Sequence, residues 1–523
     1  PAARRALVSW RDRPAARAAA LQAARQRKPE PIAVIGIAGQ FAMARDVDTF
    51  WANIASGRDC IVEIPEQRWR LRDHFREGAP TPGKTNSKWL GAIEDFDRFD
   101  PLFFNISPTE AESMEPQQRL FLQTCWHGIE DAGYRPQSLS GSQCGVFVGC
   151  GPSDYHQASR AHRLSAQGFT GAATSILAAR VSYFLNLRGP CLSIDTACSS
   201  SLVAIASACD SLNAGGSDLA LAGGVYVMAG PAMHIMTAQA GMLSPDGRCH
   251  AFDQRANGFV PGEGVGVLVL KRLADAERDG DRIQAVIEGW GINQDGKSNG
   301  ITAPNEESQT RLLQSVYRRF GIAPGEIQLI EAHGTGTKLG DPIEVAGLKA
   351  AFAPFTDRRA SCALGSVKSN IGHCLTAAGA AGMLKLVMAI RHRALPPTIH
   401  YRQRNEHIQL DDSPFYVNDT LRPWTVADGG VRRAAISSFG FSGTNAHLVV
   451  AEHRPQPQAA RRVAALTQDG RVIVPLSART EAQLRRKAED LLAFLRAQAQ
   501  APDLVALAYT LQVGRDAMGE RLG

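Results

Sequence analysis

The chain has 523 residues, 44% of them hydrophobic and 21% charged, which is the composition of a globular protein too long for one hydrophobic core. No apolar run approaches the length of a membrane span, and the ten cysteines form neither CxxC pairs nor Cys/His clusters, so neither a disulfide framework nor a metal site is predicted. The net charge of +6 resides in residues 1–28, which hold eight Arg/Lys and one Asp, so the remaining 49 basic and 50 acidic residues do not predict a nucleic-acid-binding protein.

The first 28 residues are rich in Ala and Arg, and we interpret them as a basic linker or solvated helix. From "EPIAVIGIAG" onward, short β-branched runs alternate with segments of helical periodicity. The predicted strands are 32–37, 144–148, 219–227, 265–270, 285–289 and 327–330, and apolar residues follow helical spacing over 202–212 and 312–320. This alternation predicts an α/β layered fold.

The stretches 31–275 and 283–452 each open on an apolar strand, which leaves open a structural duplication that the letters do not show. After Glu452 the Pro/Gln/Arg linker "HRPQPQAARR" leads to a smaller unit, predicted as a strand over 471–476 and a helix that begins at a Thr480/Gln483 capping box. We therefore divide the chain into a linker (1–28), two halves of one layered domain (29–275 and 276–452) and a linker with a flanking unit (453–523). The whole reads as a piece of a longer polypeptide.

Three glycine-rich segments that match two known patterns are set aside. "GKSNG" (296–300) matches a nucleophile elbow but lacks the following helix, so we interpret it as a loop. "HGTGTKLG" and "GEGVG" lack the spacing of phosphate-binding loops. Nucleotide binding is not predicted.

"DTACSSSLVAI" places Cys198 between the strand-like segment 191–194 and a helical run. A free cysteine is most often a small buried hydrophobe, so the stretch alone fits either a packing residue or a nucleophile. At a helix N-terminus, free backbone N–H groups and the helix dipole would lower the thiol pKa, and we expect this for Cys198.

Two histidines follow strands in a similar way. "IQLIEAHGTGTKLGDP" leads into His333, and "LGSVKSNIGHCLTAAGAAG" leads through Lys368 and Asn370 into His373. A lone histidine there is more often a core residue, but two in matching context beside a cysteine suggest thioester chemistry. Two neutral imidazoles could donate hydrogen bonds to the enolate formed when a malonyl thioester loses carbon dioxide. The turn "SSFGFSGTNAH" could direct the backbone N–H of Phe441 at an acyl-thioester oxygen.

In this order and at these separations, the four motifs resemble the ketosynthase domain of modular type I polyketide synthases over about residues 30–452. The resemblance implies the thiolase fold, a five-layered αβαβα and internally duplicated α/β unit, and a homodimer. It implies a catalytic triad of Cys198, His333 and His373, with the N–H groups of Cys198 and Phe441 as the oxyanion hole.

The resemblance also implies the reaction and its supporting residues. Cys198 would accept an acyl chain from an upstream acyl carrier protein, and the histidines would stabilise the enolate from a malonyl carrier protein. The supporting residues would be Lys368 and Asn370, and the pantetheine arm would be contacted by Thr335, Thr337, Phe441 and Ser442. No metal or bound cofactor is implied, because the phosphopantetheine arm belongs to the carrier protein.

"LAYTLQVGRDAMGERL" (507–522), "MEPQQRLFLQTCWHGIEDAGY" and "VGCGPSDYH" are similar to ketosynthases of trans-acyltransferase assembly lines. That similarity implies a small C-terminal α/β flanking subdomain and a separate trans-acting acyltransferase. A cytoplasmic location is expected from the scattered cysteines, which fit a reducing compartment. The sequence departs from the family at Leu375, where Glu is common, and at Ser442, where Gly is common.

Three alternatives remain beside chain elongation: a non-elongating ketosynthase that only transfers chains, a ketosynthase of a branching module, and a degradative thiolase. A structural docking role is kept for residues 1–28. The helix after His373 is so rich in Ala, Gly and Thr over 376–382 that we expect it to be buried against another backbone.

Overall fold

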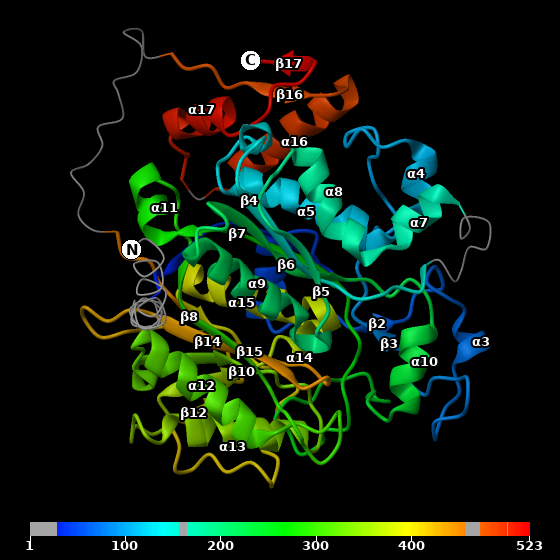
Figure 1. Cartoon of the computed structure of the whole chain (residues 1–523), viewed down its shortest axis with the longest axis vertical. Helices are drawn as coiled ribbons and strands as arrows, with labels where there is room; N and C mark the ends of the chain where they lie inside the picture. The colour runs from blue at the N-terminus through cyan, green and yellow to red at the C-terminus, as the bar shows by residue number, and fades with distance from the viewer. Residues whose placement is uncertain (1–28, 156–164, 456–470, 499) are drawn as a thin grey trace, which may run out of the picture.

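The computed structural model describes residues 29–155, 165–455, 471–498 and 500–523, so the predicted basic segment 1–28 and most of the predicted linker after Glu452 lie outside the described residues. Its centre is an 11-stranded sheet in the order β12-β10-β9-β14-β15-β8-β1-β7-β6-β4-β5 (Figure 1). The strands are β1 (Ile32–Phe41), β4 (Cys144–Gly149), β5 (Cys191–Ile194), β6 (Leu219–Tyr226), β7 (Gly264–Arg272), β8 (Ala285–Gln294), β9 (Leu329–Glu331), β10 (Cys362–Gly365), β12 (Phe415–Val417), β14 (Arg433–Phe439) and β15 (Thr444–Ala451).

The sheet contains the same five-strand pattern twice. In the first half, the order β1-β7-β6-β4-β5 has two antiparallel pairings followed by two parallel ones. In the second half, the order β8-β15-β14-β9-β10 repeats that sequence of pairings. The duplication that the sequence left open is therefore present in the strand topology.

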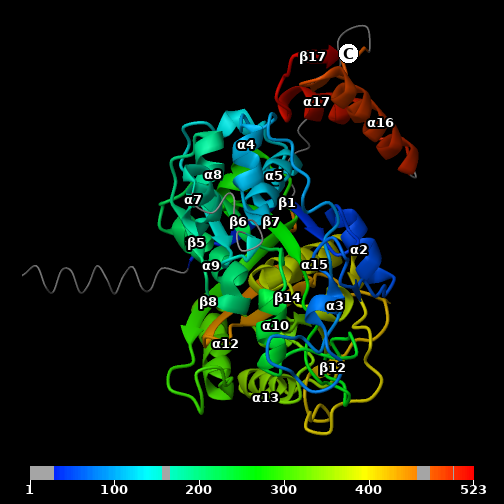
Figure 2. The ribbon, with the colours of Figure 1, turned by 90° about the vertical axis from the view of Figure 1, so that its right-hand side faces the viewer.

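Helices cover the two halves in layers (Figures 1 and 2). Helices α5 (Pro116–Asp131) and α8 (Thr174–Leu185) pack on the outside of the first half, and α12 (Glu306–Phe320) and α13 (Gly340–Phe352) lie outside the second. Helices α9 (Ser200–Asn213) and α15 (Ala378–His392) pack against each other between the halves. The five-layered α/β arrangement expected from the sequence is confirmed.

Shorter elements complete the core. They are α2 (Val47–Ala55), β2 (Val62–Glu63), α3 (Leu71–His74), β3 (Trp89–Leu90), α4 (Pro108–Ser113), α7 (Ala166–Ala172), α10 (Ala232–Gln239), α11 (Leu273–Asp279), α14 (Lys368–Ile371), β11 (Ala394–Leu395) and β13 (Arg422–Pro423). Within the described residues, no helix is long and apolar enough to cross a lipid bilayer.

The flanking unit consists of β16 (Leu476–Ala478), α16 (Glu481–Ala497), α17 (Leu504–Val513) and β17 (Glu520–Leu522). The N-cap half of the predicted capping box is confirmed, because the Thr480 hydroxyl accepts the N–H of Gln483 at 3.3 Å, whereas the Gln483 side chain bonds Asp100 instead of the Thr480 N–H. The predicted strand over 471–476 is wrong in its bounds: only its last residue belongs to a strand, β16, which pairs Leu476–Ala478 with the three residues of β17. The unit packs on the core through hydrogen bonds such as Gln483 Nε2 to Asp100 Oδ2, 2.8 Å.

The small residues after His373 are buried, as expected. Every residue of α15 from Ala378 to Ile390 is buried. A Cβ atom added to Gly379 would lie 2.8 Å from both the backbone N and the Cβ of Leu202 in α9, which explains why this position has no side chain. The hydroxyl of Ser201 accepts the N–H of Ala380 at 3.0 Å and joins the two central helices.

We predict that Gly379→Leu destabilises the fold by about 1–3 kcal/mol, because the new side chain must displace the first turn of α9. The change should appear as a lower melting temperature. Gly519→Leu is the matched control, because a Cβ at Gly519 meets nothing within 4 Å. Equal melting temperatures for the two variants would contradict close packing at Gly379.

Candidate active site

Four loops that follow strands from both halves of the central sheet meet in one place. Cys198 follows β5, His333 follows β9, His373 follows β10 and Phe441 lies in the turn between β14 and β15. The strands that lead into Cys198, His333 and His373 are parallel to their neighbours, and the carboxyl ends of such strands are the usual position of functional groups. Residues up to 243 positions apart in the chain thus converge because β5 and β14 belong to the two halves that enclose α9 and α15.

Cys198 lies in a single 3₁₀ turn, Ala197–Ser199, directly before α9. The preceding residue, Ala197, has φ +58°, a left-handed conformation that a non-glycine residue rarely adopts. Two side chains hold it there: Asp195 Oδ1 accepts the N–H of Ala197 at 3.0 Å, and the Ser200 hydroxyl donates to its carbonyl at 2.6 Å. The turn therefore fixes the direction of the Cys198 side chain.

The glycine-rich turn of residues 440–443 closes over this loop. A Cβ atom on Gly440 would lie 2.3 Å from the carbonyl oxygen of Thr196, so only glycine fits. The Ser442 hydroxyl lies 3.5 Å from the same carbonyl oxygen. This close approach brings the backbone N–H of Phe441 to the sulfur of Cys198, while 55% of the Phe441 residue surface remains exposed.

The expected low pKa of Cys198 is wrong. Burial raises the pKa of the thiol to about 11, and the charge of Lys368 and the N–H groups of Phe441 and Cys198 only partly oppose that effect. Cys198 is only 8% exposed. The free-energy cost of desolvating a thiolate there exceeds the stabilisation that the helix N-terminus and the Lys368 charge provide. Before a substrate binds, the sulfur is a neutral thiol.

The two histidines face each other and share one tautomer. Their ring centroids lie 5.6 Å apart, with the planes at 84°. The Nδ1 of His333 accepts the N–H of Phe439 at 3.3 Å, and the Nδ1 of His373 accepts the N–H of Leu375 at 3.2 Å. A neutral imidazole that accepts at Nδ1 carries its proton on Nε2, so both rings are Nε2–H donors.

Electrostatics keep both rings neutral. Burial, then the positive charge of Lys368, lowers the pKa of His333 and of His373 well below the ordinary value, and His373 lowers that of His333 further. At neutral pH each ring therefore offers one hydrogen-bond donor and no charge.

Lys368 and two acidic residues hold the loop of His333. The Lys368 ammonium group donates to the carbonyl of His333. The carboxylate of Glu344, in the first half of α13, accepts the N–H groups of His333 and Gly334 at 2.7 and 2.8 Å. Asp341 accepts the N–H of Gly336 at 3.2 Å in the same loop.

Asp341 and Glu344 were not identified from the sequence as functional. Burial raises the pKa of Glu344 to about 7 and that of Asp341 to about 6. Two carboxyl residues three positions apart, at the start of a helix whose only other charged residue is Lys349, were the signal that could have revealed them.

The other residues noted from the sequence lie in the loop after His333 and in the segment around His373. Thr335 and Thr337 lie in the loop after His333, with their hydroxyls 3.3 Å apart. Asn370 does not contact either histidine through its amide, which instead donates to the carbonyl of Arg58 at 3.0 Å. Leu375 contacts His373 through its backbone N–H, and its φ is +43°. Because the side chain takes no part, the hydrogen bond to His373 is kept although Leu stands where the family commonly has Glu.

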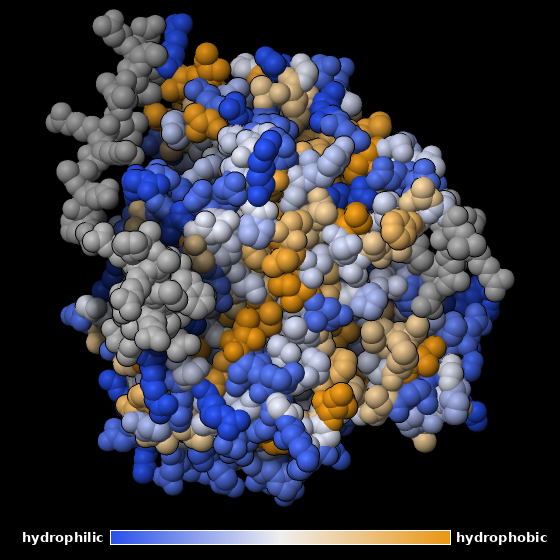
Figure 3. All heavy atoms as spheres, in the orientation of Figure 1, coloured by the Kyte–Doolittle hydropathy of each residue, from blue (hydrophilic) through white to orange (hydrophobic). Residues whose placement is uncertain are grey.

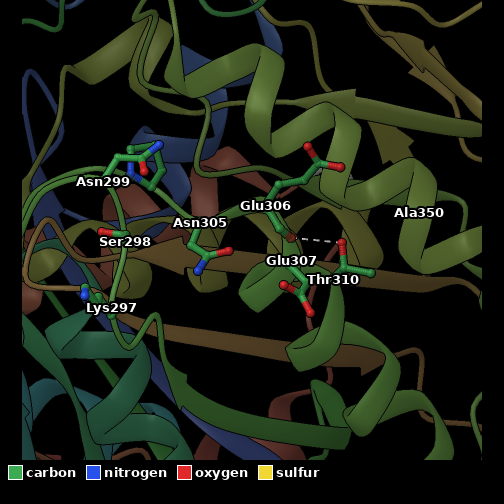
Figure 4. Close-up of a pocket in the computed structure, with 9 residues that line it drawn as sticks. Lys297, Ser298, Asn299, Asn305, Glu306, Glu307, Thr310 and Ala350 are labelled. Carbon is green, nitrogen blue, oxygen red and sulfur yellow. Dashed lines mark hydrogen bonds between the residues drawn. The ribbon is translucent and has the colours of Figure 1, made fainter.

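The "GKSNG" segment lines a surface pocket of about 760 Å³ rather than the cysteine–histidine site (Figure 4). Its serine, Ser298, donates to the carbonyl of Gly300 at 2.6 Å within an exposed loop. The segment has no strand-to-helix elbow, because turn residues follow it. The interpretation of this match as a loop is confirmed.

Three family profiles match the chain. "Beta-ketoacyl synthase, N-terminal domain" covers residues 29–276, "Beta-ketoacyl synthase, C-terminal domain" covers 284–402, and "Ketoacyl-synthetase C-terminal extension" covers 405–519. The chain belongs to the β-ketoacyl synthase family. Its fold is the thiolase fold of these condensing enzymes, which are acyltransferases.

Relatives of this ketosynthase include Polyketide synthase PksL of Bacillus subtilis (strain 168), 47% identical over 499 residues that make up 95% of this chain and 11% of that protein. Polyketide synthase ThaG of Burkholderia thailandensis is 48% identical over 94% of this chain and 9% of its own length. The chain thus spans about a tenth of the length of these two relatives.

Among solved structures, the ketosynthase from module 6 of the bacillaene synthase of Bacillus subtilis 168 superposes with a TM-score of 0.85 at 46% identity, covering 94% of this chain and 82% of that one. The oxazolomycin ketosynthase domain OzmH KS7 of Streptomyces albus JA3453 gives a TM-score of 0.86 at 39% identity, covering 94% and 85%. These likenesses confirm the resemblance drawn from the four motifs.

We predict that iodoacetamide alkylates Cys198 in the free enzyme at a rate that rises about tenfold per pH unit from pH 7 to 9, because only the thiolate reacts and its pKa is raised. Peptide mass spectrometry measures the rate, and a Cys198→Ser variant gives the background from the other cysteines. A plateau below pH 8 would mean that the thiol pKa is low after all.

Proposed function

We propose that this ketosynthase extends a polyketide chain by decarboxylative Claisen condensation, joining a Cys198-bound acyl group to malonyl carrier protein. The observation that carries the proposal is the pair of neutral imidazoles whose Nδ1 atoms each accept a backbone N–H. Two Nε2–H donors side by side suit an enolate oxygen, which appears only after a malonyl thioester has lost carbon dioxide.

In the first half-reaction, Cys198 takes the acyl group from an upstream carrier protein. Its sulfur forms a bond to the thioester carbonyl carbon, and the N–H groups of Cys198 and Phe441 receive the oxygen as it becomes negative. The bond to the phosphopantetheine sulfur then breaks, and the proton of the Cys198 thiol ends on that departing sulfur. The raised thiol pKa means that little thiolate is present at neutral pH before the acyl thioester binds.

In the second half-reaction, malonyl carrier protein loses carbon dioxide, and the electron pair of the broken carbon–carbon bond forms the enolate. His333 and His373 donate to its oxygen, while Lys368 and Glu344 hold the His333 loop. The enolate carbon attacks the acyl carbon on Cys198. A β-ketoacyl carrier protein leaves, and the Cys198 thiolate takes up a proton.

The competing functions are less well supported. A non-elongating ketosynthase needs no enolate site, whereas here His333 is present and its tautomer is fixed by Phe439. A degradative thiolase needs a second catalytic cysteine in the C-terminal glycine-rich turn, and residues 437–447 contain none. A ketosynthase of a branching module would use the same condensation chemistry.

The partners we propose follow from this chemistry. Upstream and downstream acyl carrier proteins bring the phosphopantetheine arm, which Thr335, Thr337, Phe441 and Ser442 would contact, and the domain itself holds no cofactor. A separate trans-acting acyltransferase would load the malonyl group. All ten cysteines are free, which fits action in the cytoplasm.

We further propose a homodimer formed across β5. This strand is the edge of the 11-stranded sheet, so one of its sides has no strand partner among the described residues. Large apolar side chains are exposed around it: Leu192 on β5, Tyr183 on α8 and Phe169 on α7, at 46%, 89% and 76%. Apolar side chains gather across the middle of this face (Figure 3), as expected for a covered surface.

Cys198→Ala should abolish acyl loading and leave the melting temperature nearly unchanged, because only one sulfur atom is removed from a turn held by Asp195 and Ser200. Intact-mass measurement after incubation with an acyl thioester reports loading. A Cys191→Ala variant, which alters the half-buried cysteine of β5, should still be loaded. Persistent acylation of Cys198→Ala would refute the assignment of the nucleophile.

His333→Ala should still become acylated at Cys198 but should extend the chain about 100- to 1,000-fold more slowly, because loading does not pass through an enolate. Intact mass follows the first step, and product formation with malonyl carrier protein follows the second. His407→Ala, at an exposed histidine, is the control. Equal loss of both steps in folded protein would give His333 a loading role instead.

Leu192→Asp should convert the dimer to a monomer, because it places a charge on the edge strand at the proposed two-fold axis. Light scattering after size exclusion measures the mass. Leu421→Asp, at a similarly exposed leucine away from β5, should remain dimeric. A Leu192→Asp protein that keeps the dimer mass would contradict this interface.

A further inference from the structure

The wall of the site behind Cys198 is formed by the ends of β4 and β6. A Cβ atom on Gly149 would lie 2.3 Å from the backbone N of Ser201, and one on Gly224 would lie 2.5 Å from the Ser201 Cβ. Both strands therefore end directly against the first turn of α9, which begins two residues after the nucleophile. Figure 1 shows β6 beside α9.

Tyr226 is the last residue of β6 and lies two residues beyond Gly224. Because side chains alternate along a strand, its phenol extends from the same face as the Gly224 position, toward α9. The core packing agrees: Tyr226 belongs to the hydrophobic cluster that contains Leu202 of α9, whereas its neighbours Val225 and Val227 belong to the cluster on the other side of the sheet.

The phenol is buried, and its hydroxyl has no hydrogen-bond partner. Tyr226 is 5% exposed, yet no donor or acceptor among the described residues pairs with its oxygen. The ring is buried but the oxygen is not fully enclosed, because it is not one of the enclosed polar atoms without a partner in the described residues. This hydroxyl is therefore accessible to a ligand.

The surroundings of the Tyr226 hydroxyl keep it protonated. Burial, then the negative charges of Asp154 and Glu263 and the interaction with Cys198, raises the pKa of Tyr226 well above its ordinary value. The phenol thus remains a neutral donor and acceptor across the working pH range.

The neighbouring positions on this wall carry no side chain. The first turn of α9 packs directly on Gly149 and Gly224, and a Cβ on Gly151 would lie 3.4 Å from the Thr376 methyl group and 3.7 Å from Asp195 Oδ2. Tyr226 is thus the first side chain beyond Gly224 on this face of β6.

We propose that Tyr226 is a specificity-determining residue that hydrogen-bonds an oxygen on the acyl chain close to the thioester, so that Cys198 accepts 3-hydroxyacyl groups in preference to fully reduced chains of equal length. The inference rests on the proposed function, because it presumes that Cys198 is acylated. A reduced chain would cover this hydroxyl without pairing it, and sites built to hydrogen-bond a substrate hydroxyl discriminate against the analogue that lacks it.

The test compares the rates at which Cys198 is acylated by butyryl and by each enantiomer of 3-hydroxybutyryl N-acetylcysteamine thioester, followed by intact mass. We expect the wild-type enzyme to react at least about tenfold faster with one 3-hydroxybutyryl enantiomer than with the butyryl thioester. Tyr226→Phe removes only the hydroxyl and should bring that ratio close to one. Tyr509→Phe, at an exposed tyrosine of the flanking unit, should keep the wild-type ratio.

Equal wild-type rates, or a ratio that Tyr226→Phe leaves unchanged, would overturn the role of Tyr226 while leaving the proposed function intact. Failure of every thioester to acylate wild-type Cys198 would overturn the proposed function and this inference with it. A melting temperature for Tyr226→Phe equal to that of the wild type establishes that a changed ratio does not arise from unfolding.

Discussion

The chemistry of this ketosynthase depends on two backbone hydrogen bonds, from Phe439 to His333 and from Leu375 to His373. Each occupies an Nδ1 atom and so leaves the proton on Nε2. Side chains at these positions could be exchanged without loss of the bond, but the backbone cannot move. The loops around the site are therefore held by buried groups such as Glu344, Lys368 and Ser366, the last of which donates to the carbonyl of Gly334 at 2.7 Å.

The duplicated fold explains why these bonds meet in one place. Equivalent strands in the two halves, β5 and β10, lead into the cysteine and one histidine, and the central helices α9 and α15 follow each of them. The helices can approach closely because Gly379 leaves space for Leu202. A buried ion pair, Lys385 with Glu331 at 2.6 Å, joins α15 to the end of β9, just before His333. Packing in the middle layer thus sets the spacing between the nucleophile and the enolate site.

Much of this could be predicted from the sequence, because local patterns dictate it. The strand before Cys198 was predicted with its observed bounds, and the Ala/Gly composition after His373 predicted a buried helix. The low thiol pKa was wrong because burial of Cys198 arises when three distant loops close around it, which no local pattern reveals. Glu344 was missed for the same reason: its partners are backbone N–H groups eleven and ten residues earlier, in a loop whose shape the letters do not show.

The structure also explains why the two departures from the family pattern, Leu375 and Ser442, leave the site intact. Leu375 supplies a backbone N–H, so its side chain does not decide the tautomer of His373. Ser442 lies in the exposed part of the turn, whereas the close contact that shapes the turn is made by Gly440. The tautomer of His373 and the shape of the 440–443 turn are therefore set by backbone atoms and not by these two side chains.

The most direct test of this account is the protonation state of the two histidines. Nitrogen-15 NMR of the histidine-labelled enzyme, with His333→Gln and His373→Gln variants to assign the signals, distinguishes the neutral tautomers from the imidazolium form. The account predicts that both rings are neutral, with the proton on Nε2, throughout pH 6 to 8. An imidazolium signal, or a proton on Nδ1, from either ring at pH 7 would contradict it.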